Sequence, residues 1–315
     1  FNNGLIPPKD WIVAWSDNGF GDFEFLPKDT KGYEFGTYMH AGFWSNHTVH
    51  NPYPHKVETV MKTMFQDFGA DKYSMINGQN FRPFLLNIEA YSEVCNSPEN
   101  FNGELFYRDW VERYFGIEVG EYALASMKNL HKAQENRIGY VQHLWEIREA
   151  ISYLSNAPIE RPGKTPVPYD YKRVENDFEH VINTEIIIAM ALSKAEKGLQ
   201  LLKKEGSFYY SYIYLPSLLY SDLISFERTL HQMAILKKKY EDNNDTAFLN
   251  QCLALIGQSK KDLQRLYEHR EAGDKNNKWA NWYAPEIRRP NNGFPTVEML
   301  QAIETNLNLQ IKKSI

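Results

Sequence analysis

The chain has 315 residues, of which 43% are hydrophobic and 24% are charged, and its formal net charge at pH 7 is −5. This composition supplies enough apolar side chains for packed cores and excludes a disordered chain, and the length predicts about two domains. The acidic balance argues against a dedicated nucleic-acid binder. The longest uncharged run, residues 206–221, contains Pro216 and five tyrosines, so we also expect no membrane span.

The first hundred residues alternate between predicted strands and predicted helices. Short strand-like runs occupy residues 11–15, 36–40 and 72–76. Apolar residues at helical spacing predict a helix over 55–68 that ends at Gly69, and Pro83 begins another that runs to about residue 95. This order is typical of βα units with a parallel sheet, and about three units are too few to close an eight-stranded barrel.

From about residue 101 the pattern is helical, so we expect an α/β segment over 1–100 followed by an all-α domain over 101–315. The apolar periodicity predicts helices over about 104–115, 120–154, 174–190, 218–240 and 247–270. A proline-rich connector over 158–168 and a loop-like tail that returns from residue 276 complete this domain.

The candidate site lies where the predicted strands end, because ligands bind at the carboxyl ends of the strands in parallel βα folds. These positions carry polar or ring-bearing side chains after all three strands: Asp17, Asn18, His40, Trp44, Asn77 and Gln79. Carboxamide and imidazole groups provide both donors and acceptors, which suits a ligand rich in hydroxyl groups.

Each of these residues also has a structural interpretation. Asp17 and Asn18 are residue types that favour turns, His40 could be a structural histidine, and Asn77 could help to cap the following helix. What favours a binding site is therefore that the loops after all three predicted strands carry such side chains.

The histidines between positions 40 and 55 match no zinc-ligand spacing, and Cys95 and Cys252 form no metal or disulfide pattern. We expect no metal ion and no cofactor. In the tail, Arg288 and Arg289 could bind a carboxylate in bidentate fashion or form a solvated basic pair.

The strand-end loops resemble those of family 115 glycoside hydrolases, which are xylan α-glucuronidases. Residues 15–21 (Trp-Ser-Asp-Asn-Gly-Phe-Gly), 26–27 (Leu-Pro) and 36–40 (Gly-Thr-Tyr-Met-His) follow the order and spacing of the family motifs. Residues 75–79 and 82–83 resemble motifs that come later in the family.

The resemblance implies a fold and a function. The chain would be the last part of a TIM-like barrel followed by a helical bundle, within a longer enzyme that removes glucuronic or 4-O-methylglucuronic acid from xylan. His40 falls on an active-site histidine and Asp17 on one of the paired acidic positions that follow the first strand. If the tail folds back over the mouth of the barrel, we expect Arg288 or Arg289 to bind the uronate carboxylate. The acid and base carboxylates would lie in an upstream part of the same protein, so we expect the isolated chain to be inactive. The family is exported, which implies a secreted or periplasmic enzyme.

The alternative is a non-catalytic carbohydrate-binding module or a helical interaction module, because the helices carry no chemistry that the sequence identifies. The expected ligand of the enzyme is a carbohydrate, namely hemicellulose or an oligosaccharide that bears uronic acid. Formation of a homodimer is left open.

Overall fold

A computed structural model of the chain divides into two compact units, Phe1–Leu124 and Ala125–Ile315. The first unit contains a parallel sheet and the second is helical, so the predicted change from α/β to all-α structure is confirmed. No helix among the described residues is long and apolar enough to cross a membrane. The structure describes residues 4, 6–27, 29–42, 48–49, 53–78, 84–135, 139–161, 164–167, 170–202, 207–275, 280–283 and 294–314.

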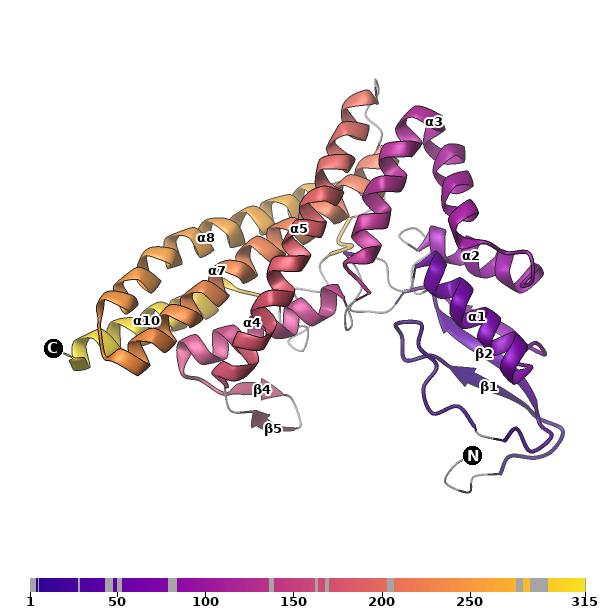
Figure 1. Cartoon of the computed structure of the whole chain (residues 1–315), viewed down its shortest axis with the longest axis horizontal. Coiled ribbons are helices and arrows are strands. Elements are labelled where there is room, and N and C mark those ends of the chain that lie inside the picture. Colours follow the sequence, from indigo (N-terminus) through magenta and orange to yellow (C-terminus); the bar gives the residue numbers. More distant parts are fainter. Residues whose placement is uncertain are drawn as a thin grey trace. The chain divides into compact units, whose positions relative to one another are not determined.

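The first unit is built on three parallel strands in the order β1 (Ile12–Ser16), β2 (Glu34–His40) and β3 (Ser74–Asn77) (Figure 1). Helix α1 (Pro54–Phe68) connects β2 to β3, and α2 (Leu85–Asn96) follows β3. Each element lies close to its predicted range. Gly69 ends α1 in the left-handed conformation, with φ of 57°, as the sequence predicts.

One face of this sheet is covered by α1 and α2. Phe35 of β2 belongs to a hydrophobic cluster with Met64 of α1. Thr37 lies on the same face, and its hydroxyl is 3.3 Å from the hydroxyl of Tyr91 on α2. Burial raises the pKa of Tyr91 to about 12, so this hydroxyl stays neutral and donates to the carbonyl of Met75. These contacts fix the two helices on one side of the sheet.

The opposite face carries the alternate residues of β2, Tyr38 and His40, because successive side chains of a strand point to opposite sides. Ile12 and Met75 lie on this face by the strand register and are 46% and 41% exposed. Parallel sheets are normally covered on both faces. Three strands do not close a barrel, and the partial TIM-like barrel stays a prediction.

Helix α3 (Gly103–Lys132) begins in the first unit and bends at Gly116, which has φ of 75° and ψ of 169° (Figure 1). Its first half is joined to α1 and α2, since the N–H of Gly103 donates to Glu58 over 2.7 Å and Arg113 pairs with Glu89. The compact units accordingly divide after Leu124, whereas the sequence analysis expected a domain boundary near residue 100.

The prediction of a single helix over 120–154 is wrong, because α3 ends at Lys132 and a separate helix, α4 (Tyr140–Ser155), follows. Gly139 precedes α4 with φ of 61°, a conformation that interrupts a helix. The side-chain oxygen of Gln134 accepts from the N–H of Tyr140 over 3.0 Å and stabilises the break.

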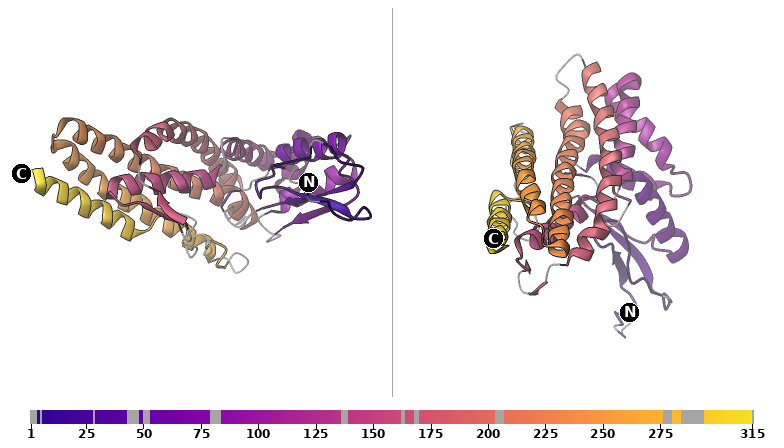
Figure 2. Two further views of the ribbon diagram at one scale, coloured as in Figure 1. Left: turned by 90° about the horizontal axis from the view of Figure 1, so that it is seen from below. Right: turned by 60° about the vertical axis from the view of Figure 1, so that its left-hand side comes forward.

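The second unit is a bundle of long helices. Helix α7 (Leu215–Asn243) packs against α4, α5 (Tyr171–Leu201) and α8 (Ala247–Asp274). Helix α10 (Val297–Ser314) packs against α4 and α8. Figure 2 shows these helices from two further directions. The fully buried Leu223 and Leu230 of α7 lie on the predicted apolar face.

Three features of this unit differ from the sequence analysis. The connector predicted over 158–168 contains an antiparallel pair, β4 (Ile159–Arg161) and β5 (Lys164–Val167), in which Ile159 lies opposite Val167. A short helix, α6 (Ser207–Tyr209), and a π-helical turn, η1 (Tyr210–Tyr214), extend α7 towards its N-terminus. Helix α10 follows the tail that was expected to be loop-like, and its buried positions recur at helical spacing.

Candidate active site

The ends of the three strands meet at one edge of the sheet. Asp17 directly follows β1, His40 ends β2 and Asn77 ends β3. The backbone N–H of Asp17 donates to the carbonyl of Tyr38 over 3.1 Å, and the N–H of Ala41 donates to the carbonyl of Asn77 over 3.0 Å. The parallel register therefore places three of the predicted site residues along this edge.

Asp17 and His40 form a direct pair. Nδ1 of His40 lies 2.5 Å from Oδ1 of Asp17, and the backbone N–H of His40 donates to the same oxygen over 3.2 Å. The other carboxylate oxygen accepts from the N–H of Gly21 over 2.8 Å. Because a carboxylate oxygen accepts hydrogen bonds, Nδ1 of His40 is the donor of this pair.

The two members of the pair differ in exposure. The side chain of Asp17 is fully buried, whereas that of His40 is 13% exposed. The ring of Tyr38 meets the ring of His40 edge to face, with 5.0 Å between their centroids. A buried carboxylate that orients a partly exposed imidazole is the arrangement by which enzymes hold a histidine for proton transfer or for hydrogen bonding to a ligand.

The exposed side chain of Asn18 shapes the loop after β1. Its Oδ1 accepts from the N–H of Phe20 over 3.0 Å and from that of Asp22 over 3.3 Å, and its Nδ2 donates to Glu24 over 3.0 Å. These contacts form an Asx-type turn and agree with the turn interpretation. A substrate role for Asn18 stays a prediction.

The other predicted site residues cannot be located at this edge. Trp44, Gln79, Arg288 and the neighbouring Arg289 lie outside the described residues.

The sequence analysis missed one residue that supports this edge. Asn87 of α2 is buried, and its Nδ2 donates to the carbonyl of Ala41, directly after His40, over 2.7 Å. Asn87 shares a helix face with the buried Ala90 and Val94. A carboxamide within an apolar stripe was the signal that could have identified it, because buried polar side chains need partners.

In parallel βα folds, enzyme sites usually lie at the carboxyl edge of the sheet. The position of the Asp17–His40 pair at this edge is therefore that of a candidate enzyme site. Residues 1–138 match the family described as glycosyl hydrolase family 115, which confirms the resemblance over this part of the chain. The matched part contains both Asp17 and His40. It supports a carbohydrate-active function.

A solved structure is similar over a longer range. It is described as a GH138 enzyme targeting pectin rhamnogalacturonan II, and it matches with a TM-score of 0.56 and 12% sequence identity. The match covers 89% of this chain and 47% of that chain, so this chain spans about half the length of that structure. At this identity the likeness concerns the fold alone. No curated protein matches the sequence.

Proposed function

We propose that the chain is part of a glycoside hydrolase in which the Asp17–His40 pair lines a sugar subsite. The observation that carries the proposal is the 2.5 Å contact between Asp17 and His40 at the carboxyl edge of the sheet, within the segment that matches the hydrolase family. Asp17 holds the imidazole in one orientation and one tautomer. His40 then binds a sugar hydroxyl or a uronate oxygen, groups that imidazole recognises well.

The substrate that we propose is a xylan side chain of glucuronic or 4-O-methylglucuronic acid, and the enzyme is exported to reach it. The family match over residues 1–138 supports this assignment. Asn77 beside His40 offers a carboxamide to the same ligand.

The sheet is proposed to be the last part of a TIM-like barrel. All three strands are parallel, α1 and α2 cover one face, and the other face carries exposed apolar side chains such as Ile12 and Met75. Such a face fits the interior of a barrel, where side chains of all strands pack together. His40 lies on this face at its carboxyl end.

Glycoside hydrolysis normally requires two carboxyl groups beside the scissile bond. Asp17 is poorly suited to either role, since it is buried and accepts hydrogen bonds from His40 and Gly21. We therefore propose that the acid and base belong to an upstream part of the same protein. The isolated chain of 315 residues then has no turnover.

The test uses the full-length protein with His40→Ala, and with His55→Ala as the matched control. His55 lies near the start of α1 in the same unit, is 44% exposed, and pairs with Glu58 and Glu104 rather than with Asp17 or His40. Turnover is measured on xylo-oligosaccharides that bear 4-O-methylglucuronic acid, and folding is monitored by circular dichroism. We expect His40→Ala to lose about two orders of magnitude or more in kcat/KM, while His55→Ala keeps the wild-type value.

Unchanged turnover in a folded His40→Ala protein would overturn the site and favour the non-catalytic module. If the wild type released galacturonic acid from pectic oligosaccharides and no uronic acid from xylan, the proposal of a glycoside hydrolase would stand and the proposed xylan substrate would be overturned. Turnover by the isolated chain would overturn the upstream position of the acid and base.

A further inference from the structure

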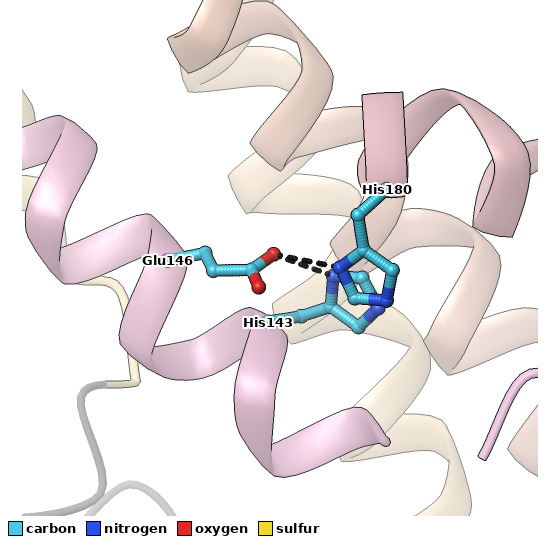
Figure 3. A group of neighbouring side chains, drawn as sticks. All are labelled: His143, Glu146 and His180. Carbon is cyan, nitrogen blue, oxygen red and sulfur yellow. Dashed lines mark hydrogen bonds and ion pairs between the residues drawn. The ribbon is translucent and has the colours of Figure 1, made fainter. Parts of the chain in front are cut away.

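A second cluster of ionisable side chains lies inside the helical unit. His143 and Glu146 lie one turn apart on α4, His180 is on α5 and Glu227 is on α7. His143 and Glu227 have no exposed side-chain surface, and Glu146 and His180 are 1% and 10% exposed. Figure 3 shows the ring of His180 stacked over that of His143, with the carboxylate of Glu146 facing both.

The donor atoms of this cluster are spaced like the ligands of a metal ion. Nδ1 of His143 lies 2.8 Å from Oε2 of Glu227 and 3.5 Å from Oε2 of Glu146, and Nδ1 of His180 lies 3.2 Å from Oε2 of Glu146. One ligand atom each from His143, Glu146 and His180 lies within 4.8 Å of the other two. Tetrahedral zinc with bonds of 2.0–2.1 Å places its donor atoms about 3.3 Å apart. The observed separations lie on either side of this value.

An independent observation comes from Glu227. Its second oxygen, Oε1, is buried and has no hydrogen-bond partner among the residues that the structure describes. A buried carboxylate oxygen that lacks a partner is unfavourable. A cation bound to this carboxylate would remove the deficit, and the fixed geometry of the carboxylate keeps Oε1 next to the oxygen that contacts His143.

We propose that His143, Glu146, His180 and Glu227 bind a divalent transition-metal ion that links α4, α5 and α7. The set offers two imidazole nitrogens and two carboxylates and no thiolate, which suits zinc, cobalt, iron or manganese in the divalent state. Calcium and magnesium prefer sites made of oxygen ligands alone. This proposal departs from the expectation that the protein holds no metal.

The arrangement of the two imidazole rings shows what metal binding would require. The two imidazole rings are nearly parallel, with 9° between their planes and 4.6 Å between their centroids. An ion bound in the plane of one ring would lie outside the plane of the other, so one imidazole must turn about its Cβ–Cγ bond. Because the cluster is buried, the ion is expected to enter while the helices assemble.

The competing explanation is a buried ion-pair network in which a proton on His143 joins the carboxylates of Glu146 and Glu227. Such a network needs no metal, and replacement of one member leaves a buried charge without a partner. Metal content, rather than stability alone, therefore separates the two explanations.

The experiment refolds the chain from denaturant after treatment with a chelator, in the presence of Zn²⁺, Co²⁺ or Mg²⁺. Free metal is removed by gel filtration, and bound metal is measured by elemental analysis and by the visible absorption of Co²⁺. Affinity is measured by competition with a chromophoric chelator. The variants are His180→Gln and Glu227→Gln, and the control is His269→Gln, a histidine of the same unit that contacts Asp222 and is 33% exposed.

We expect the wild type and His269→Gln to retain about one equivalent of Zn²⁺ or Co²⁺ and no Mg²⁺. His180→Gln and Glu227→Gln should weaken binding by about tenfold or more. If the refolded wild type retains no metal, or if His180→Gln and Glu227→Gln bind Zn²⁺ as tightly as the wild type, the proposal is overturned. Should either variant fail to refold, the amount of metal bound to the refolded wild type and its Co²⁺ spectrum still test the proposal. Ligation by His and Glu gives Co²⁺ a visible spectrum that free Co²⁺ lacks.

Discussion

Nδ1 of His40 lies 2.5 Å from Oδ1 of Asp17, although the two residues are 23 positions apart in the sequence. The pairing of Ser16 with Tyr38 in the parallel sheet produces this contact, because it carries the end of β1 to the end of β2. The orientation of His40 thus depends on the register of the sheet.

The first prediction concerns the carboxylate of Asp17. Asp17→Asn should lower the free energy of unfolding by about 1–3 kcal/mol, because the new amide NH₂ meets N–H groups that need an acceptor. The control is Asp22→Asn in the same loop, where the half-exposed carboxylate pairs with Lys56 and the change should be below about 1 kcal/mol. Urea unfolding followed by tryptophan fluorescence measures both. Equal effects of the two variants would contradict the role given to Asp17.

The second prediction compares two glycines. A Cβ added at Gly36 would lie 2.4 Å from the carbonyl oxygen of Tyr73, so Gly36→Ala forces β2 and β3 apart. We expect a loss of about 1–3 kcal/mol in the free energy of unfolding.

Gly257, an exposed residue inside α8, is the matched control, since a Cβ there meets no atom within 4 Å. Gly257→Ala should stabilise the protein by about 0.5–1 kcal/mol. Thermal unfolding compares the two variants. A stable Gly36→Ala protein would show that the two strands are not so closely packed.

The third prediction concerns Lys237 of α7, which is buried and supports the end of α4. Its ammonium donates to the carbonyl of Tyr153 over 2.9 Å and to Oδ1 of Asn156 over 2.8 Å, and it pairs with Glu241 over 2.9 Å. Lys237→Met keeps the volume and removes these bonds. We expect a loss of about 2 kcal/mol or more, measured by urea unfolding at pH 7.

Lys237 also predicts a dependence on pH. Burial lowers the pKa of Lys237 below its usual value, even though Glu241 favours the charged form. Between the lowered pKa and about 10.4 the unfolded chain binds more protons than the folded chain, so stability rises with pH in this window. As the pH rises through this window, the free energy of unfolding of the wild type should therefore increase relative to that of Lys237→Met. If the difference in the free energy of unfolding between the wild type and Lys237→Met stayed constant up to about pH 10, the lowered pKa of Lys237 would be contradicted.

The fourth prediction concerns the two thiols. Cys252 is buried, and burial raises its pKa to about 12, while Cys95 is partly buried and its pKa is raised as well. Thiolates are the reactive species, so a thiol reagent at about pH 7.5 should modify Cys252 only on unfolding and Cys95 more slowly than a free thiol. The Cys95→Ser variant isolates Cys252. Rapid modification of this folded variant would contradict the burial.

The alternation of strands and helices in the first unit could be predicted from the sequence, because each element carries its own apolar pattern. The strand-end rule also selected Asp17, His40 and Asn77. The contact between Asp17 and His40 could not be predicted, since a shift of one residue in register would place His40 on the other face of the sheet.

The buried cluster of the helical unit shows a different limit. His143 and Glu146 are visible in the sequence as polar residues within an apolar run, but nothing local relates them to His180 or Glu227. Their meeting depends on how α4, α5 and α7 pack, which periodicity alone does not determine. The hairpin of β4 and β5 was missed for a related reason, because strands this short are too brief to show alternation.

The course of α3 has a consequence for dividing the protein. The division between Leu124 and Ala125 falls inside this helix, so no loop joins the two compact units. A chain cut there would lose about the last two turns of the helix and leave carbonyl groups at its new end without partners. The family match instead continues to residue 138, beyond the end of α3 at Lys132. The piece suited to separate expression is therefore longer than the compact unit, and it retains the whole of α3.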